Sequence, residues 1–519
     1  MLTINFFTWL LAFTPVILVL FLMTAFKWGG SKAGMLTWII TQVIAVVFFG
    51  ATLELLQFAY LKAFFLALDV LLIIWGAMFL YQVTKKAGTI QIIGSFLSEL
   101  TENRAFLGIF LGWLFPSFLQ GMGGFGVPVA VSAPLLVSAG FSPILSVIIT
   151  SIGHGWGVTF GSMGSSFRTL MAVSGLSAEV LAPYASILLG IASLLCGFFV
   201  VYLSGGKKHF LKALPLTLLS AGILSLGQFI LSTNGLWAIA VTLPSMAGLG
   251  FGFLYLRFFS KYSRDYFRNK SKEEFRELIT TLLPYIILVS LIVIFNFFEP
   301  LKNLFDPFAI KFEFPEISTT FGFITPAESG KKINLFLHPG VVIMISALIS
   351  FVFLKKKNLF KGNELPEIIS TTFNSSLNTS IAIFSLVGTA VVMNHAQMTN
   401  ILAVGISAVV NREIYPIVSP FIGVLGAFIT GSNNNSNVLF GSLQQQTAEI
   451  LNLPVTLILA AQTAGGALGS IMAPAKVILG CSTVGLAGKE GDVIGKLVLS
   501  CCIIVLFIGI ATYVIAGFI

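Results

Sequence analysis

The run from Thr430 to Lys476 is the feature that most restricts the fold of this chain. It reads TGSNNNSNVLFGSLQQQTAEILNLPVTLILAAQTAGGALGSIMAPAK, a dense group of small and amide residues between apolar segments. The chain of 519 residues is 56% hydrophobic and only 9% charged, which is typical of polytopic membrane proteins. Because lipid cannot hydrogen-bond a polar backbone, such a run must be buried among helices or line an aqueous cavity. Broken helices lining a cavity form the substrate sites of many transporters.

A second run of the same construction lies earlier, between Gln120 and Ser166. It reads QGMGGFGVPVAVSAPLLVSAGFSPILSVIITSIGHGWGVTFGSMGSS. Offsets of 310 to 312 align Gly121 with Gly431, Ser132 with Ser442, Pro143 with Pro454, and SIGHGWG from Ser151 with TAGGALG from Thr463. A break, an apolar half-helix, a proline-led helix and a second glycine-rich break recur in that order, so we predict an internal structural repeat.

The fold predicted from hydropathy is an all-α polytopic membrane protein with about 12 transmembrane helices plus two re-entrant hairpins in an inverted repeat. The opening run, about 20 apolar residues without a basic leader, is interpreted as a first span and not as a cleaved signal. The apolar runs are 5–26, 35–56, 63–83, 143–165, 180–203, 213–232, 235–258, 278–298, 338–354, 372–394, 454–472 and 494–518. The loop 299–332, rich in phenylalanine, is interpreted as a folded cap or interfacial loop in preference to a gate.

Basic loops orient these spans, because lysine and arginine favour the cytoplasmic side. With Lys85 and Lys207 both inside, the spans 143–165 and 180–203 already go out and return, so a hairpin near 105–140 must enter and leave from the cytoplasm. The same count makes a hairpin near 415–451 enter from outside, unless 401–410 is a short span that changes the parity.

The chain 1–519 is thus expected to be one integral unit in three parts. They are a first repeat half, 63–203, middle spans and connectors, 204–337, and a second half, 338–519. Two opposed hairpins that meet near the midplane are an arrangement suited to alternating access.

The hairpin tips are the predicted site for a small anion, because half-helix N-termini offer unpaired N–H groups and a positive dipole end. We predict that substrate contacts come from the tips and the adjacent breaks: Gln120, Gly121, Gly123, Gly124, Gly126, His154, Ser432, Asn433, Asn434, Asn435, Ser436, Asn437, Gln462 and Thr463. For single glycines, tight helix packing is the favoured alternative. For the NNNSN group a binding site is favoured.

Two titratable residues inside apolar runs are candidates for ion coupling. His154 could carry a proton or face a substrate carboxylate, and Asp69 is an intramembrane carboxylate. A purely structural role is equally consistent with either residue. Arg168 is interpreted as an interfacial anchor in preference to an entry funnel, and His338 as a span-end residue that contacts water or headgroups.

Other classes of function have little support in the sequence. The net charge of +9 comes from lysine and arginine in short loops between spans, so nucleic acid is not an expected partner. The four cysteines lack metal or redox spacing, and no nucleophile elbow, HExxH or Walker motif occurs, so we expect no enzyme activity, metal or cofactor. An ion-gradient carrier is favoured over a nucleotide-driven pump.

The motifs resemble those of the L-lactate permease family. The stretches that carry the resemblance are FLYQVTKKAGTIQII from Phe79, FLQGMGGFGVPVAVSAPLLVSAGFSP from Phe118, FGSMG from Phe160, TGSNNNSNVLFGSLQ from Thr430, and AAQTAGGALGSIMAP with GLAGKEGD in the final third. The resemblance implies a multi-pass plasma-membrane symporter that takes up lactate, and usually glycolate, with a proton.

The chain departs from the family pattern within these motifs. Gln120 and Asn433 are amides where the family typically has carboxylates, while His154 and Gln462 replace asparagines. If those carboxylates carry proton coupling, His154 or Asp69 must replace them, or the chain couples to sodium or moves another small carboxylate. A channel or sensor with fixed hairpins is the alternative from a different class, and the sequence leaves the oligomeric state open.

Overall fold

The computed structural model describes residues 4–124, 126–329, 333–360, 362–486 and 489–519. Phe125 of the first tip, residues 330–332 of the long loop and Ala487–Gly488 of the GLAGKEGD motif lie outside these ranges. Within them, eleven helices are long and apolar enough to cross a membrane, and the strands form only two-stranded pairs. The prediction of an all-α polytopic membrane protein is confirmed.

The N-terminal helices are α1 (Phe6–Thr24), α2 (Gly30–Phe49) and α3 (Leu53–Lys86). Both α2 and α3 pack against α16 (Leu365–His395), and α3 also packs against α15 (Pro339–Lys356), whereas α1 packs against α2 and elements of the second repeat. Gly50, at φ 67°, ends α2, and the Thr52 hydroxyl caps α3 by accepting from the N–H of Leu55. The predicted second span, 35–56, is therefore wrong at its end, because the chain turns at residues 50–52.

The first repeat consists of a short helix, a helical hairpin and a helix that is broken in its middle. Its elements are α4 (Thr89–Ser98), α5 (Arg104–Leu107), a π-helical turn (Gly108–Leu114), α6 (Phe115–Met122), α7 (Val127–Ser138), α8 (Pro143–Gly155) and α9 (Gly161–Ser174). The predicted continuous span 143–165 is wrong: α8 ends at Gly155, turns follow at 156–160, and Ser162, Met163 and Gly164 at the start of α9 all have left-handed backbone angles. Such angles cannot continue a right-handed helix.

The second repeat has the same order of elements. They are α17 (Met398–Ser407), α18 (Tyr415–Thr430), α19 (Asn433–Ile450), α20 (Val455–Ile471), α21 (Pro474–Thr483) and the final helix α22 (Glu490–Phe518). With 10 residues, α17 is about 15 Å long, half of a bilayer core of about 30 Å. Residues 401–410 therefore do not form a span that would change the parity.

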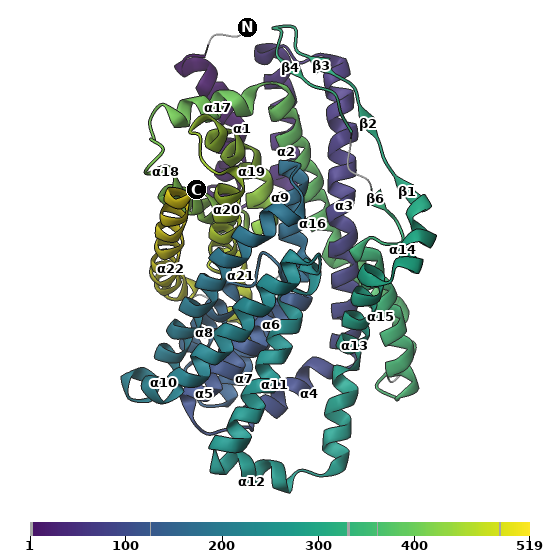
Figure 1. Cartoon of the computed structure of the whole chain (residues 1–519), viewed down its shortest axis with the longest axis vertical. Helices are drawn as coiled ribbons and strands as arrows, with labels where there is room; N and C mark the ends of the chain where they lie inside the picture. Colours follow the sequence, from purple (N-terminus) through teal and green to yellow (C-terminus); the bar gives the residue numbers. More distant parts are fainter. Residues whose placement is uncertain (1–3, 125, 330–332, 361, 487–488) are drawn as a thin grey trace.

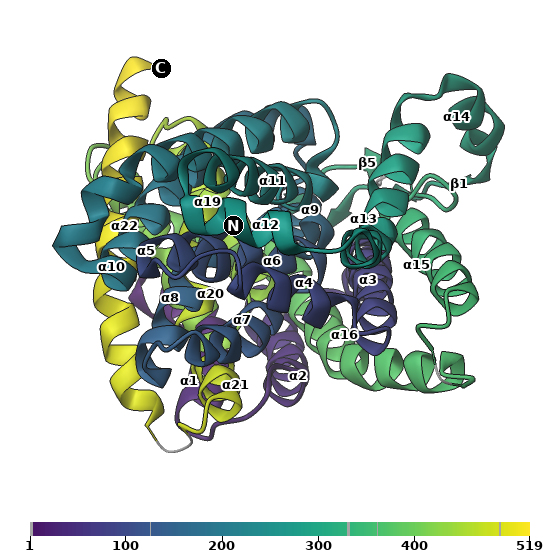
Figure 2. The same cartoon turned by 90° about the horizontal axis from the view of Figure 1, so that it is seen from below.

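The middle of the chain supplies flanking helices and a ribbon. They are α10 (Ala178–Thr233), interrupted at Gly206, η2 (Trp237–Ile239), α11 (Thr242–Phe259), α12 (Lys261–Asn269), α13 (Lys272–Phe297), α14 (Glu299–Phe305) and η3 (Asp306–Phe308). The ribbon pairs β1 (Ala309–Ile310) with β6 (Ile333–Asn334), β2 (Glu313–Phe314) with β5 (Glu328–Ser329), and β3 (Ile317–Ser318) with β4 (Ile324–Thr325). Figure 2 shows α13, α14 and α15 together on one flank, with α22 on the opposite flank. The long loop is thus a folded ribbon, fastened by the N–H of Thr320 to the carbonyl of Gly50.

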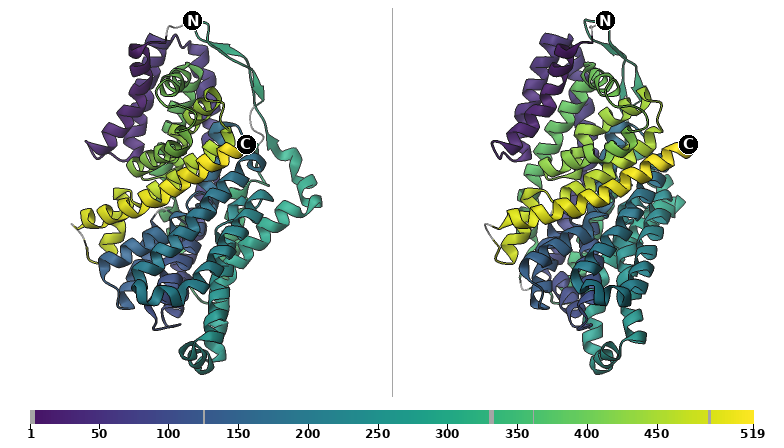
Figure 3. Two further views of the ribbon diagram at one scale, coloured as in Figure 1. Left: turned by 60° about the vertical axis from the view of Figure 1, so that its left-hand side comes forward. Right: turned by 90° about the vertical axis from the view of Figure 1, so that its left-hand side faces the viewer.

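The hairpins of the two repeats lie toward opposite ends of the molecule. In Figure 1, α5 to α8 lie in the lower half with α21, whereas α18, α19 and α20 lie in the upper half with α9. Figure 3 shows α22 running obliquely across both halves. Each hairpin packs on its own broken helix, and its second arm also contacts the second arm of the other broken helix, α7 on α21 and α19 on α9. The two hairpins and the two broken helices therefore meet in the middle of the molecule.

Candidate functional site

The second hairpin presents a buried group of amides at the start of a helix. Gly431, in the left-handed region, ends α18, and the Ser432 hydroxyl accepts from the N–H of Asn435 at 3.5 Å to begin α19. Residues 433–437 are all buried, at most 6% exposed. The N-terminal end of α19, with its unpaired N–H groups and positive dipole end, is therefore located inside the protein.

The Asn433 and Asn437 amides connect this tip to both broken helices. Asn433 Nδ2 donates to Thr159 Oγ1 at 3.1 Å and to the carbonyl and hydroxyl of Thr463 at 3.2 and 3.3 Å. Asn437 Nδ2 donates to the Ser166 carbonyl and to Thr463 Oγ1, both at 3.0 Å. The Thr159 hydroxyl in turn donates to the Thr463 carbonyl at 3.1 Å, and Asn434 accepts from the Ser166 hydroxyl. We call these six residues, Thr159, Ser166, Asn433, Asn434, Asn437 and Thr463, the amide network.

A second chain of hydrogen bonds fixes the orientation of α19 behind this network. Gln462 Nε2 donates to the Ser436 hydroxyl at 3.0 Å, and that hydroxyl donates to the Gly423 carbonyl at 2.8 Å. Gln444 Nε2 donates to Gln462 Oε1 at 3.0 Å and Gln444 Oε1 accepts from the Tyr415 hydroxyl at 2.6 Å. Ser436 and Gln462 thus hold hairpin and broken helix together, and fully paired buried polar groups of this kind add rigidity.

The first hairpin tip reaches the same region from the other side through glycines. A Cβ on Gly124, which has φ 54°, would collide with the Ser162 hydroxyl, and one on Gly161 would collide with the Gln120 side chain. Gly126, at φ 87°, faces Leu479 of α21. Both tips therefore contact residues 159–166, the break between α8 and α9, which lies between them.

Several predicted site residues lie beside this centre and not within the amide network. Gly121 packs against Thr242, Gly123 against the Tyr81 ring, and the Asn435 side chain lies near Gly30 of α2. His154 Nδ1 lies 2.6 Å from the Thr150 carbonyl of its own helix, and the side chain is 1% exposed. These predicted residues lie near the amide network, but the sequence did not reveal Thr159 and Ser166, which pair with α19 across more than 260 positions.

Four buried amide atoms at the centre have no hydrogen-bond partner among the described residues. They are Asn433 Oδ1, Asn434 Nδ2, Asn437 Oδ1 and Gln120 Oε1. A buried polar atom without a partner is unfavourable by about 1–3 kcal/mol, so such atoms are rare. Ser162 and Met163, which follow each other in the chain beside this centre, both have left-handed backbone angles. Such backbone strain tends to occur at functional sites. The arrangement can offer both a donor and acceptors to a small polar ligand or a cation.

Asp69 forms a separate buried cluster. Its carboxylate accepts from Arg168 Nε and Nη2, and its Oδ1 lies 3.1 Å from His338 Nε2. Because the N–H of Gly340 donates to His338 Nδ1 at 3.1 Å, the histidine carries its proton on Nε2 and donates it to Asp69. The side chains of Arg168 and His338 are 12% and 2% exposed. The interpretations of Arg168 as an interfacial anchor and of His338 as a span end in contact with water are therefore wrong.

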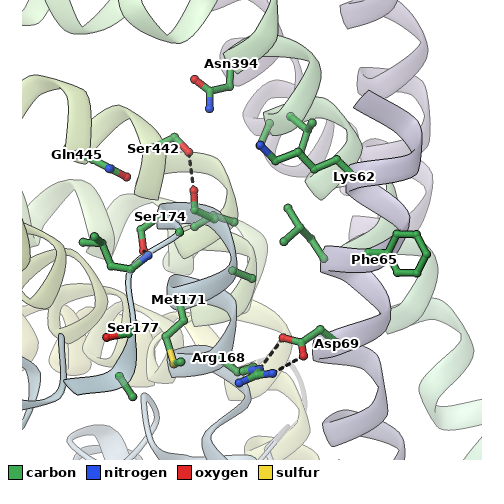
Figure 4. A pocket seen from close by; sticks show the side chains of 18 of the residues that line it. Lys62, Phe65, Asp69, Arg168, Met171, Ser174, Ser177, Asn394, Ser442 and Gln445 are labelled. Carbon is green, nitrogen blue, oxygen red and sulfur yellow. Dashed lines mark hydrogen bonds and ion pairs between the residues drawn. The ribbon is translucent and has the colours of Figure 1, made fainter. Parts of the chain in front are cut away.

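A cavity of about 740 Å³ lies next to this cluster. Its walls come from α3, α9, α16 and α19, with Asp69 and Arg168 at one end (Figure 4). The helices α9 and α19 also carry Ser166 and Asn437, and the Ser442 hydroxyl ties them together by donating to the Val173 carbonyl at 3.1 Å. The cavity and the amide network therefore share two walls.

Comparisons with known proteins found permeases that are similar over most of the chain. The chain is 28% identical to the glycolate permease GlcA of Escherichia coli strain K12, with 97% of this chain and 94% of that protein covered. It is 30% identical to the L-lactate permease of Streptococcus iniae, with 86% and 91% covered, and 28% identical to that of Bacillus subtilis strain 168, with 93% and 91% covered. Among solved structures, the YdaH transporter of Alcanivorax borkumensis is similar at 14% identity and a TM-score of 0.47, over 86% of this chain and 85% of that one.

The permease relatives and the apolar helices indicate a multi-pass membrane transporter and not an enzyme, consistent with a bacterial plasma membrane. The family model described as L-lactate permease matches residues 8–519, which is nearly the whole chain. The chain belongs to the L-lactate permease family.

Proposed function

We propose that this protein is a secondary active carrier that takes up lactate, and glycolate or similar small monocarboxylates, by symport with a cation, most simply a proton. The observation that carries the proposal is the amide network, which joins one hairpin tip to Thr159 at the break between α8 and α9 and to Thr463 within α20. The names of the relatives, L-lactate permease and glycolate permease, support the substrate class.

A carboxylate can be held at this centre without a permanently buried positive charge. The N-terminal end of α19 supplies a positive dipole end, and Asn434 Nδ2 is an unpaired donor beside it. The second arm of the first hairpin, α7, begins at Val127 with Pro128 early in its first turn and adds a second helix N-terminus. In this proposal the hairpins are re-entrant from opposite membrane faces, so that each can cover the site from one side.

Coupling to a proton requires a group that titrates, and the two tip positions where the family has carboxylates are amides here. We propose Asp69 as the coupling residue, with His154 as the second candidate. Asp69 is 1% exposed and lies in α3, whose residues line the cavity beside the amide network. An intramembrane carboxylate is a default candidate for such a role.

Sodium coupling is the second candidate, and one observation favours it. Asn433 Oδ1 and Asn437 Oδ1 are one turn apart on α19, and neither has a hydrogen-bond partner in the described part of the chain. Amide oxygens are hard ligands suited to such cations.

The test is uptake of labelled lactate into proteoliposomes under separate proton and sodium gradients. We expect saturable uptake with counterflow exchange, accelerated by an inward proton gradient, and loss of that acceleration in Asp69→Asn or His154→Ala. Asp265→Asn, an exposed carboxylate on α12, is the matched control and should retain acceleration. If only a sodium gradient accelerates uptake, the coupling ion is sodium and not the proton. Uptake that does not saturate and shows no counterflow would support a channel and overturn the carrier.

A further inference from the structure

Arg168 forms one end of the cavity, and contacts with neighbouring side chains hold its guanidinium in one orientation. Asp69 holds the Arg168 guanidinium by its side edge, through Nε and Nη2. Cζ of the guanidinium lies over the Trp237 ring, 5.7 Å from the ring centroid. Asp69 itself is fixed by His338. The guanidinium is thus positioned by three groups from three different elements.

This arrangement leaves the other edge of the guanidinium available. Arginine has five N–H groups, and the bonds to Asp69 use one on Nε and one on Nη2. Both N–H groups of Nη1 and the second of Nη2 have no hydrogen-bond partner among the described residues, and the side chain lines the cavity. These two nitrogens form the end edge, which matches the two oxygens of a second carboxylate. Asp69 does not block it.

The charges around the cavity favour an anion at this inner end. Lys62 lies two turns before Asp69 on the same face of α3 and is half-buried, and the His395 imidazole lies at the end of α16. The other carboxylates that line the cavity, Glu179 and Glu449, are exposed. Asp69 is the only carboxylate among the lining residues that is buried, and Arg168 balances its charge. Lys62 adds a second positively charged side chain to the cavity lining.

The size of the cavity also fits a small organic acid. Its volume of about 740 Å³ lies within the range of small-molecule sites, about 300–1,000 Å³, and leaves room for a three-carbon acid with water. The polar side chains of Ser442 and Gln445 on α19 line another part of the wall, away from Asp69 and Arg168 (Figure 4).

We propose that Arg168 binds the carboxylate of the substrate end-on in this cavity, with Asp69 and His338 as positioning residues, as a binding step distinct from the amide network. This inference rests on the proposed transport of small monocarboxylates and assigns the residue that recognises the acid group. A plain structural ion pair would give the same contacts but different effects of mutation, because then both partners would be equivalent.

The experiment is isothermal titration calorimetry of the purified full-length protein in nanodiscs, with L-lactate, glycolate and uncharged lactamide as probes. Arg168→Lys keeps the charge but loses the planar fork, and we expect it to raise Kd for lactate about tenfold. Arg168→Gln combined with Asp69→Asn removes both charges together, so no buried ion is left unpaired, and should raise Kd about 100-fold. Asp69→Asn alone keeps a side-chain oxygen that can accept from the guanidinium but removes the charge that orients it most strongly, so it should raise Kd by less than Arg168→Lys does.

Controls separate this inference from the transport proposal. Arg412→Gln, an exposed arginine, should bind lactate as the wild type does, and lactamide binding should be insensitive to Arg168 variants. If the wild type binds neither lactate nor glycolate, the proposed function fails. If it binds them but the double variant binds within twofold, or if Asp69→Asn weakens binding as much as Arg168→Lys does, the role of Arg168 is overturned while the carrier stands.

Discussion

The two repeats use the same packing where their backbones touch. In the first, a Cβ on Gly153 of α8 would come closer than 3.0 Å to the carbonyl oxygen of Gly112 in the first hairpin. In the second, a Cβ on Gly465 of α20 would come equally close to the carbonyl of Pro420. Gly153 and Gly465 are 312 positions apart, the offset at which SIGHGWG aligns with TAGGALG. In each repeat a glycine allows the broken helix to lie directly against the hairpin.

The repeats differ at their tips and breaks. The second tip is a capped helix start with asparagines that bond across the molecule, and its broken helix restarts at Pro474. The first tip is a glycine turn beside Gln120, and its broken helix restarts through left-handed residues at Ser162 and Met163. The shared glycine contacts therefore provide a symmetric frame, while side-chain polar bonding belongs to the second tip and backbone strain to the first break. The two repeats are therefore alike in the order and packing of their helices but not in the chemistry of their tips.

The largest expected effect tests the shared frame. Gly153→Ala and Gly465→Ala should each lower the free energy of unfolding by at least about 3 kcal/mol, because the new methyl group meets a backbone oxygen that can move only with its helix. The measurement is the melting temperature of the detergent-purified protein. The two variants should behave alike.

The matched control for both variants is Gly222→Ala in α10. A Cβ there meets nothing within 4 Å, so the melting temperature should stay the same or rise. A wild-type melting temperature for either Gly153→Ala or Gly465→Ala would show that the two contacts are not equivalent.

The next effect tests the asymmetry of the tips. Asn433→Leu removes three hydrogen bonds and leaves Thr159 and Thr463 without them, which should cost about 1–3 kcal/mol and abolish uptake. Gln120→Met, of similar shape, removes an amide whose Oε1 has no partner in the described residues, so the stability of the unliganded protein should not fall. The measurements are the melting temperatures of the two variants, with and without lactate, and their uptake of lactate into proteoliposomes. Equal destabilisation by the two variants would contradict the asymmetry.

The order of helices and breaks in the two repeats could be predicted from the sequence, because close backbone contacts need small residues, and recurring glycines and prolines mark where they occur. The sequence also located the polar centre, since a group such as NNNSN has no partner in lipid. It could not identify Thr159 or Ser166 as partners of α19, because hydroxyls in apolar segments usually bond their own helix, and 268 positions separate Ser166 from Asn434. Asp69 was recognised as exceptional, but Arg168 and His338 were not assigned to it, because hydropathy gives the depth of a residue and not its neighbours.

The smallest effect concerns the breaks and should have opposite signs in the two repeats. Ser162 has φ 47°, a left-handed angle that costs a non-glycine residue about 1–2 kcal/mol. Ser162→Gly should therefore raise the free energy of unfolding by about 1 kcal/mol, less the entropy that glycine adds to the unfolded chain. The position 312 residues later is Pro474, in the first turn of α21, where proline fits the helix start. Pro474→Gly should lower stability by up to about 1 kcal/mol, because the unfolded chain gains freedom.

Melting curves of the two variants, compared with the wild type, test this prediction. If Ser162→Gly is also destabilising, the left-handed angles do not store strain, and the two breaks differ only in shape. If it stabilises the protein but slows uptake, the strain at the first break contributes to transport.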